Sequence, residues 1–242
     1  MKFYSLANRN MKEISRDPVS LLLGLVMPIV LLILFSSIQK NVRLEIFSPQ
    51  SLTPGIIVFC FAFLIMFSAI LLAKDRQSAF LVRLFTTPLK PSDYILSYVI
   101  PFIPLAFFQA VICMIVGVLL GATFVNIIGS LLLFLLFSLS CICLGIIIGS
   151  LFTVNQVSGI GSLLITAIGL FSGAWMDLKM VGGIFEAIGN ALPFAHAVDA
   201  SKGLLSGSSF GDISNSFYII TIYSVILFLL AILSFRWTMK RT

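Results

Sequence analysis

The chain has 242 residues, of which 60% are hydrophobic and only 10% charged, and its formal net charge is +6. Soluble globular domains carry about 25% charged residues, so this composition excludes a water-soluble protein. The hydrophobic residues fall in uninterrupted runs, many of them as long as the ~20 residues that a membrane-spanning helix needs. The sequence therefore predicts an all-α integral membrane protein with a single transmembrane domain over residues 1–242.

Charge-free segments locate the individual spans. The longest one runs from Tyr94 to Met176 and must fold back on itself, because at ~20 residues per span it holds three helices. Its polar breaks lie at 121–126 and 153–156. Six transmembrane helices are predicted, at about residues 19–38, 54–73, 94–120, 127–152, 157–176 and 215–236.

The distribution of lysine and arginine predicts the orientation. Of the 15 such residues, 11 lie near the N-terminus, in the loop 74–93 or near the C-terminus, and 4 lie in the segments 39–53 and 177–214. Positively charged loops stay in the cytoplasm, so both termini and the loop 74–93 are predicted to be cytoplasmic, in the cell membrane. This rule accounts for the net charge, and no nucleic-acid partner is expected.

Residues 2–16 have an amphipathic pattern. At 100° per residue one face is apolar and the charged residues group opposite it. This pattern predicts an interfacial helix whose basic face meets anionic lipid or a cytoplasmic partner, and a simple lipid anchor is the alternative. Asp17 and Pro18 then supply an N-cap and a first-turn proline for the first span. The apolar face is formed by Phe3, Leu6, Ala7, Met11 and Ile14.

The loop after the second span mixes charge with an apolar stripe. Phe80, Leu81, Leu84 and Phe85 fall on one helix face, and Pro88 disfavours helix at the residue before it. A loop that only connects two spans need not expose large apolar residues, so the pattern predicts a short cytoplasmic helix that docks a partner. The alternative is that Phe80 and Leu84 pack back onto the bundle.

The stretch 177–214 is too long and too apolar for a simple outer loop. It is predicted to form two short helices that break at Pro193 and dip partly into the outer leaflet between spans five and six, as re-entrant elements. Glu186, Pro193 and Phe194 could gate an exit path, or the stretch could merely cap the bundle. For His196, local hydrogen bonding is favoured over a proton relay.

Several kinds of chemistry are missing from the sequence. No G-x-x-x-x-G-K-[ST] motif occurs, so ATP binding by a phosphate-cradling loop of this chain is not expected. The spans hold no paired carboxylates and no nucleophile with a base, so no catalytic residue is predicted and the chain is not expected to be an enzyme. The four cysteines lie in apolar runs without ligand spacing, and no metal is predicted.

Two pairs of glycines occur at a spacing that lets helices approach closely. They are Gly145 with Gly149 and Gly169 with Gly173. Either pair could pack within the chain. The second pair is the candidate for dimer packing through the fifth span.

Three motifs resemble, in their order and spacing, those of the membrane subunit of an ABC-2 type exporter, over nearly the whole chain. The first is the basic lead-in ending at Asp17-Pro18, before a span with Met27-Pro28. The second, over residues 83–89, is similar to the coupling helix of that family. The third, Leu192-Pro193-Phe194 followed by residues 202–207, is similar to its outer re-entrant helices.

The resemblance implies two permease subunits, as a homodimer or a heterodimer, with separate ATPase subunits that bind ATP and magnesium. Residues 2–16 then correspond to the connecting helix, with Arg9, Lys12 and Arg16. ATP-driven closure of the ATPase pair would push on the coupling residues and switch the spans between inward-open and outward-open states. The coupling residues would be Arg76, Gln77, Phe80, Leu81, Arg83, Leu84 and Pro88.

The function predicted on this basis is ATP-driven export of an amphiphilic drug, peptide or lipid-like molecule. The alternatives are a motor-independent channel or secondary transporter, and a membrane immunity or scaffold protein. Ion-coupled transporters usually place acidic residues near the bilayer midplane, and the predicted spans have none there, which weakens that alternative.

Overall fold

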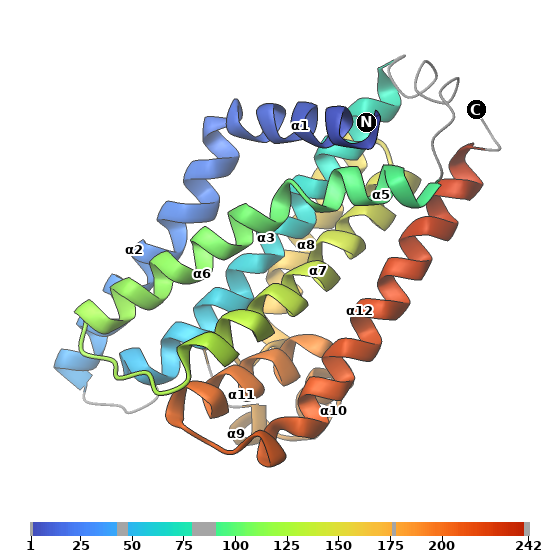
Figure 1. The fold of residues 1–242 in the computed structure, drawn as a ribbon. Helices are drawn as coiled ribbons and strands as arrows, with labels where there is room; N and C mark the ends of the chain where they lie inside the picture. The colour runs from blue at the N-terminus through green and yellow to red at the C-terminus, as the bar shows by residue number, and fades with distance from the viewer. Residues whose placement is uncertain (1, 43–47, 79–90, 176–177, 240–242) are drawn as a thin grey trace.

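The computed structural model describes the chain except for residues 1, 43–47, 79–90, 176–177 and 240–242, and the described part consists of helices with no strand (Figure 1). In chain order the helices are α1 (Lys2–Ser15), α2 (Pro18–Val42), α3 (Pro49–Gln77), α5 (Pro91–Val99), α6 (Phe102–Leu119), α7 (Ile127–Leu151), α8 (Val154–Phe171), α9 (Leu178–Val181), α10 (Gly183–Ala191), α11 (Pro193–Ser206) and α12 (Phe210–Met239).

Six helical segments are long and apolar enough to cross a membrane, and this confirms the predicted six-span fold class. Five of them are α2, α3, α7, α8 and α12. The third span, Ser92–Leu119, consists of α5 and α6, which meet at Ile100 and Pro101. The helix breaks there because proline has no N–H to donate and disfavours helical backbone at the residue before it.

Helix α3 is the centre of the bundle. In its most apolar stretch 89% of the residues are buried, against 17% in α8 and in α12. It contacts α2, α6, α7, α8 and α11. Where α7 crosses it, Gly145 and Gly149 bring the two backbones together, because a Cβ atom at Gly149 would lie 2.9 Å from the Cα of Ala69. This first glycine pair therefore packs within the chain.

Serine hydroxyls join α7 to α12 at two levels. Ser140 and Ser224 lie 2.6 Å apart, and Ser150 and Ser234 lie 2.7 Å apart. At the end of α12 the Thr238 hydroxyl donates to the Ser150 carbonyl at 3.0 Å. Such interhelical bonds contribute roughly 0.6 kcal/mol each in a membrane protein. They fix the register of a helix that otherwise has little buried surface.

Helix α1 lies across one end of the bundle (Figure 1), which we call the α1 end. The last turns of α12 lie at the same end. The turn into α2 is capped by Asp17, which accepts bonds from the Ser20 hydroxyl at 2.7 Å and the Ser20 amide at 3.2 Å. The hydroxyl bond, helped by the charge of Lys74, lowers the pKa of the Asp17 carboxyl below its ordinary value. The charged cap is therefore present at neutral pH and is lost only when acid protonates Asp17.

The opposite end, called the α11 end, is closed by α9, α10 and α11. The chain breaks between α10 and α11 at Leu192 and Pro193, as the sequence predicts. Helix α11 packs on α3, α7 and α12, and it ends at Gly207 in a left-handed conformation with φ of 88°. That these helices re-enter the outer leaflet remains a prediction.

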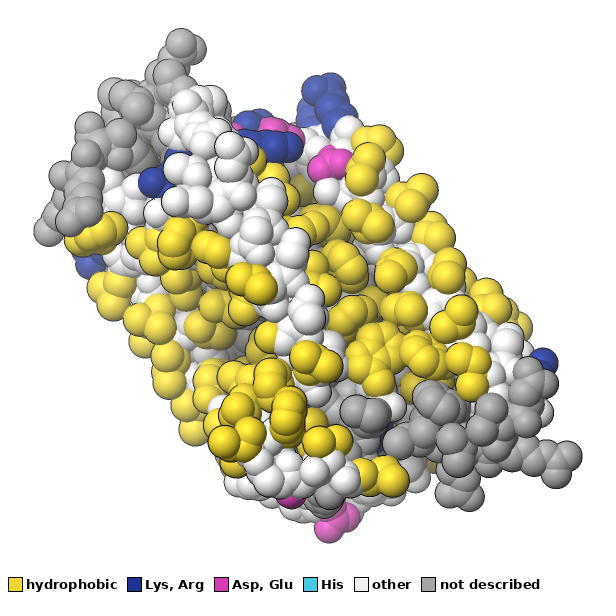
Figure 2. Space-filling model, turned by 180° about the vertical axis from the view of Figure 1, so that it is seen from behind, with side chains coloured by type: hydrophobic (Ala, Val, Ile, Leu, Met, Phe, Trp, Pro, Cys, Tyr) yellow, Lys and Arg dark blue, Asp and Glu magenta, His cyan; other side chains and the backbone are white. Residues whose placement is uncertain are grey.

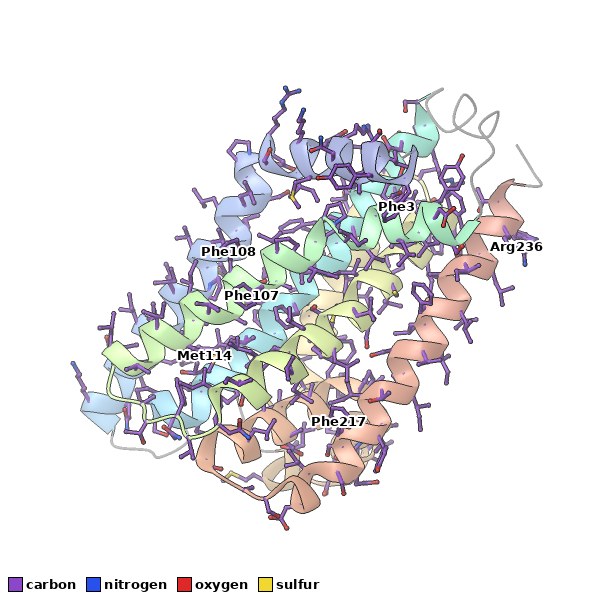
Figure 3. The ribbon with its side chains drawn as sticks, viewed as in Figure 1. Phe3, Phe107, Phe108, Met114, Phe217 and Arg236 are labelled. Carbon is purple, nitrogen blue, oxygen red and sulfur yellow. The ribbon has the colours of Figure 1, made fainter. Side chains whose placement is uncertain are left out.

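The surface between the two ends is apolar. Figure 2 shows hydrophobic side chains across the middle of one face and charged side chains gathered toward its ends. In Figure 3, Phe107 and Phe108 lie along α6, whereas Arg236 lies near the last turns of α12 at the α1 end. Phe108 is 57% exposed. This distribution is what a bilayer requires of the surface that meets its hydrocarbon core.

Candidate functional site

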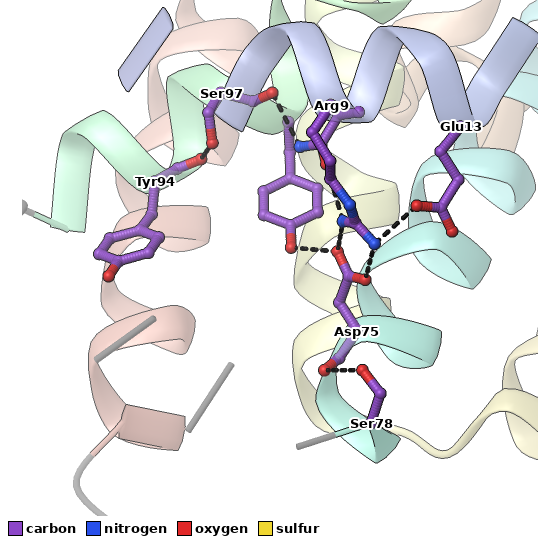
Figure 4. Close-up of polar contacts among 8 residues, drawn as sticks. Arg9, Glu13, Asp75, Ser78, Tyr94 and Ser97 are labelled. Atoms are coloured by element: carbon purple, nitrogen blue, oxygen red, sulfur yellow. Dashed lines mark hydrogen bonds and ion pairs between the residues drawn. The ribbon is translucent and has the colours of Figure 1, made fainter. Parts of the chain in front are cut away.

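A hydrogen-bonded cluster of polar side chains lies at the α1 end, where α1 meets the last turn of α3 (Figure 4). The Arg9 guanidinium donates to both carboxylate oxygens of Asp75, at 2.5 and 2.7 Å. The Asp75 side chain is only 3% exposed and that of Arg9 is 33% exposed. This fork-to-fork geometry is the strong form of an arginine–carboxylate pair. It ties the N-terminal helix to the most buried span.

Further bonds extend the pair to α5 and along α1. The buried Tyr98 hydroxyl donates to Asp75 at 2.6 Å, and the buried Asn10 amide donates to the Ser97 carbonyl at 3.0 Å. Arg9 also pairs with Glu13, one turn along α1, at 2.6 Å. We call Arg9, Asn10, Glu13, Asp75, Ser97 and Tyr98 the Arg9 network.

Electrostatics within the network favour the charged state of Arg9. Burial alone would lower the pKa of its guanidinium, but the hydrogen bond to Asp75 and the charges of Asp75 and Glu13 outweigh burial and raise the pKa above its ordinary value. Arginine is protonated at any physiological pH. Arg9 therefore contributes a positive charge to the network throughout the physiological range of pH.

Arg76 forms a second link at the same turn of α3. Its guanidinium donates to the carbonyls of Gly149 at 3.0 Å and of Phe152 at 3.3 Å, at the C-terminal end of α7. The last carbonyls of a helix have no partner within the helix and carry its negative partial charge, so a cation there is favourable. Adjacent residues of α3, Asp75 and Arg76, thus hold α1 on one side and α7 on the other.

We expect Arg76→Met to lower the free energy of unfolding by about 1–2 kcal/mol, because the end of α7 loses a charge-assisted bond. The neighbouring Gln77 is exposed, and Gln77→Met should change stability by less than about 0.5 kcal/mol. Thermal unfolding in detergent measures both. Equal shifts for the two variants would contradict this role of Arg76.

The structure separates the residues that the sequence assigned to ATPase coupling. Arg76 and Gln77 lie in the last turn of α3, whereas Phe80, Leu81, Arg83, Leu84 and Pro88 lie outside the described residues. Of the connecting-helix residues, Lys12 and Arg16 are exposed, and Arg9 turns inward to Asp75. The assignment of these residues to coupling remains a prediction.

Asp75, Tyr98 and Asn10 were not identified from the sequence. The signal available for Asp75 was its position, because it falls seven residues after Ser68 and three after Leu72, on one face of an apolar helix. A carboxylate on a core-facing stripe requires a partner. The sequence pattern gave no indication that the partner is Arg9.

The residues predicted for an outer gate are spread over the α11 end. Phe194 and Pro193 are buried, and the Phe194 ring packs edge-on against Phe137 with centroids 5.7 Å apart. Glu186, on α10, is half-buried. The His196 ring nitrogens lie 3.0 Å from the Asn190 carbonyl and 3.4 Å from the Ser216 hydroxyl. The side chain of His196 is thus hydrogen-bonded locally.

The second glycine pair lies where α8 passes α3. A Cβ atom at Gly169 would lie 3.2 Å from the ring of Phe59. Gly173 follows α8 with φ of 70°, which favours glycine, and its carbonyl accepts a bond from Lys202 at 3.4 Å. Other positions of α8, among them Leu163 and Leu170, are exposed. Dimer packing through this helix remains a prediction.

The fold and the site together define a polytopic helical membrane protein whose N-terminal helix is tied to its central span. The family model described as ABC-2 type transporter matches residues 1–206, and the chain belongs to this family. It is a membrane permease subunit of the ABC transporter type, and the family implies partnership with an ABC ATPase subunit. No curated protein matches the chain.

Proposed function

We propose that this chain is the transmembrane subunit of an ATP-driven exporter, that its α1 end faces the cytoplasm, and that the segment 79–90 docks a separate ATPase subunit. The observation that carries the proposal is the double link at the last turn of α3. Asp75 holds α1 and Arg76 holds α7, immediately before that segment begins. A force applied to the segment would therefore act on three helices together.

A force on this turn would be transmitted to the core through α3. Helix α3 is the most buried span and contacts α2, α6, α7, α8 and α11. Packed interfaces change between discrete arrangements and do not deform continuously. A shift of α3 driven by the ATPase would thus reorient its neighbours as a group. This is the movement that alternating access requires.

Charge supports the proposed orientation. Among described residues, Arg9, Lys12, Arg16, Lys74, Arg76 and Arg236 lie at the α1 end, and Lys40 and Lys202 lie toward the α11 end. Cytoplasmic ends of membrane proteins are richer in lysine and arginine. The substrate we propose is an amphiphile such as a drug, a peptide or a lipid-like molecule, because the interior of the bundle is built mainly of aliphatic and aromatic side chains.

The docking segment can be tested with a matched pair of variants. Arg83-Leu84 and Arg43-Leu44 are the same dipeptide in two different loops. We expect Arg83→Glu with Leu84→Asp to leave membrane insertion intact and to abolish co-purification of the ATPase subunit, since the change replaces an apolar and basic surface by an acidic one. Arg43→Glu with Leu44→Asp should retain the partner. Full transport by the first variant would refute docking at this segment.

A further inference from the structure

A groove of about 510 Å³ opens beneath the turn between α1 and α2. Its walls are apolar and come from three spans, with Leu23 on α2, Phe67 and Ile70 on α3, and Phe102 and Leu105 on α6. The volume lies within the range of about 300–1,000 Å³ that is usual for small-molecule sites. The groove is therefore large enough to hold an apolar chain.

Four charged residues line the mouth of the groove, and they are not equivalent. Glu13 is paired with Arg9, and Asp17 accepts both bonds from Ser20. Arg16 and Lys74 are exposed, and neither side chain has a hydrogen bond or an ion pair within the described part of the chain. Lys74 acts on the Asp17 carboxylate through its charge, but its ammonium group keeps its hydrogen bonds available, as does the Arg16 guanidinium among the described residues. The groove thus presents two cationic donors above an apolar floor.

Apolar walls together with cationic side chains at the mouth favour an amphiphile with an anionic headgroup. The groove lies at the α1 end, where the apolar surface of the spans meets the charged residues, which is the depth at which phospholipid phosphates lie. We propose that the groove binds one anionic glycerophospholipid of the surrounding leaflet, with its phosphate between Arg16 and Lys74 and an acyl chain along α3 and α6. The site goes beyond the proposed transport function and does not depend on an ATPase partner.

A bound lipid would brace the turn between α1 and α2. The residues at this turn, Arg16 to Ser20, line the groove, and α2 is weakly packed, with 22% of its apolar stretch buried. A lipid chain would fill the space between α2 and the pair α3 and α6. The membrane would then complete the packing that the chain leaves open.

The test uses the full chain purified in mild detergent, with phosphatidylglycerol and phosphatidylcholine of the same acyl chains as probes. Native mass spectrometry should show one preferentially retained phosphatidylglycerol. Each lysine or arginine near a membrane surface contributes about a fivefold gain in affinity for anionic lipid. We therefore expect Arg16→Gln or Lys74→Gln to weaken retention about fivefold, and the double variant about 25-fold.

Lys12→Gln is the matched control, because Lys12 is exposed on the same helix but does not line the groove. It should retain the lipid like the wild type. Equal retention by the double variant and the wild type would overturn the proposal, as would an equal loss in Lys12→Gln, which would indicate general attraction to a basic surface. Glycerol 3-phosphate tests the headgroup alone, and binding as tight as that of the lipid would also overturn it.

Discussion

Replacing Arg9 by methionine should lower the free energy of unfolding by about 3 kcal/mol, near the lower end for breaking a buried ion pair, because Arg9 is partly exposed and water screens part of the loss. The damage arises at Asp75, whose carboxylate is 3% exposed and, among the described residues, would keep only the Tyr98 hydroxyl as a side-chain partner. Thermal unfolding in detergent measures the change. Glu13→Gln, which breaks only the partly exposed pair, should cost less than about 1 kcal/mol.

The double variant Arg9→Met with Asp75→Asn separates packing from coupling. It removes both charges, and the amide oxygen of the new side chain can still accept the bond from Tyr98. We expect stability to recover by at least half relative to Arg9→Met, because no unpaired charge stays buried. ATP-driven transport should stay low, since the link between α1 and α3 is gone. Transport that recovers together with stability would assign the Arg9 network to folding alone.

Gly149→Ala should destabilise the bundle by about 2–3 kcal/mol, because the added methyl group would overlap the backbone of Ala69 on α3. Backbone cannot move aside as a flexible side chain can, so the two central helices must separate. The matched control is Gly159→Ala on α8, where a Cβ atom meets nothing within 4 Å. That variant should be unchanged or more stable by up to about 1 kcal/mol, since alanine favours helix over glycine.

Unfolding temperature and yield of the folded protein in detergent report both variants. The same change, glycine to alanine, is predicted to lower the unfolding temperature at position 149 and to leave it unchanged or raise it at position 159. If Gly149→Ala were as stable as the wild type, α3 and α7 would not be in the close contact that the structure shows. If Gly159→Ala were equally destabilised, the exposed face of α8 would have a partner outside this chain.

The six spans could be predicted from the sequence, because a span is marked by length and hydropathy, which are local properties of the sequence. Which of the six helices lies at the centre of the bundle could not be predicted from the sequence. All six spans are apolar, and hydropathy does not distinguish a helix that faces lipid from one that faces protein. The break at Pro101 was also missed, since the charge-free stretch from Tyr94 onward has no polar residue there to mark it.

In the candidate site, too, local sequence properties predicted some residues, whereas their partners depend on tertiary packing. Arg9 and Arg76 were predicted as functional residues from the resemblance to the ABC-2 family, and in the structure both bond within the chain, to Asp75 and to the end of α7. The sequence distance between Arg9 and Asp75 is 66 residues, and no local pattern connects them. Only the packing of α1 across the bundle brings the two charges together.

The central claim is that this permease subunit is coupled to a separate ATPase, and purification from the native host tests it most directly. The tagged chain would be extracted in mild detergent, and mass spectrometry would identify the proteins that accompany it. We predict a stoichiometric nucleotide-binding subunit whose ATP hydrolysis rises when the complex is reconstituted in lipid, and falls in the Arg9→Met, Asp75→Asn variant. A chain recovered alone, where a control ABC complex survives, would contradict the account.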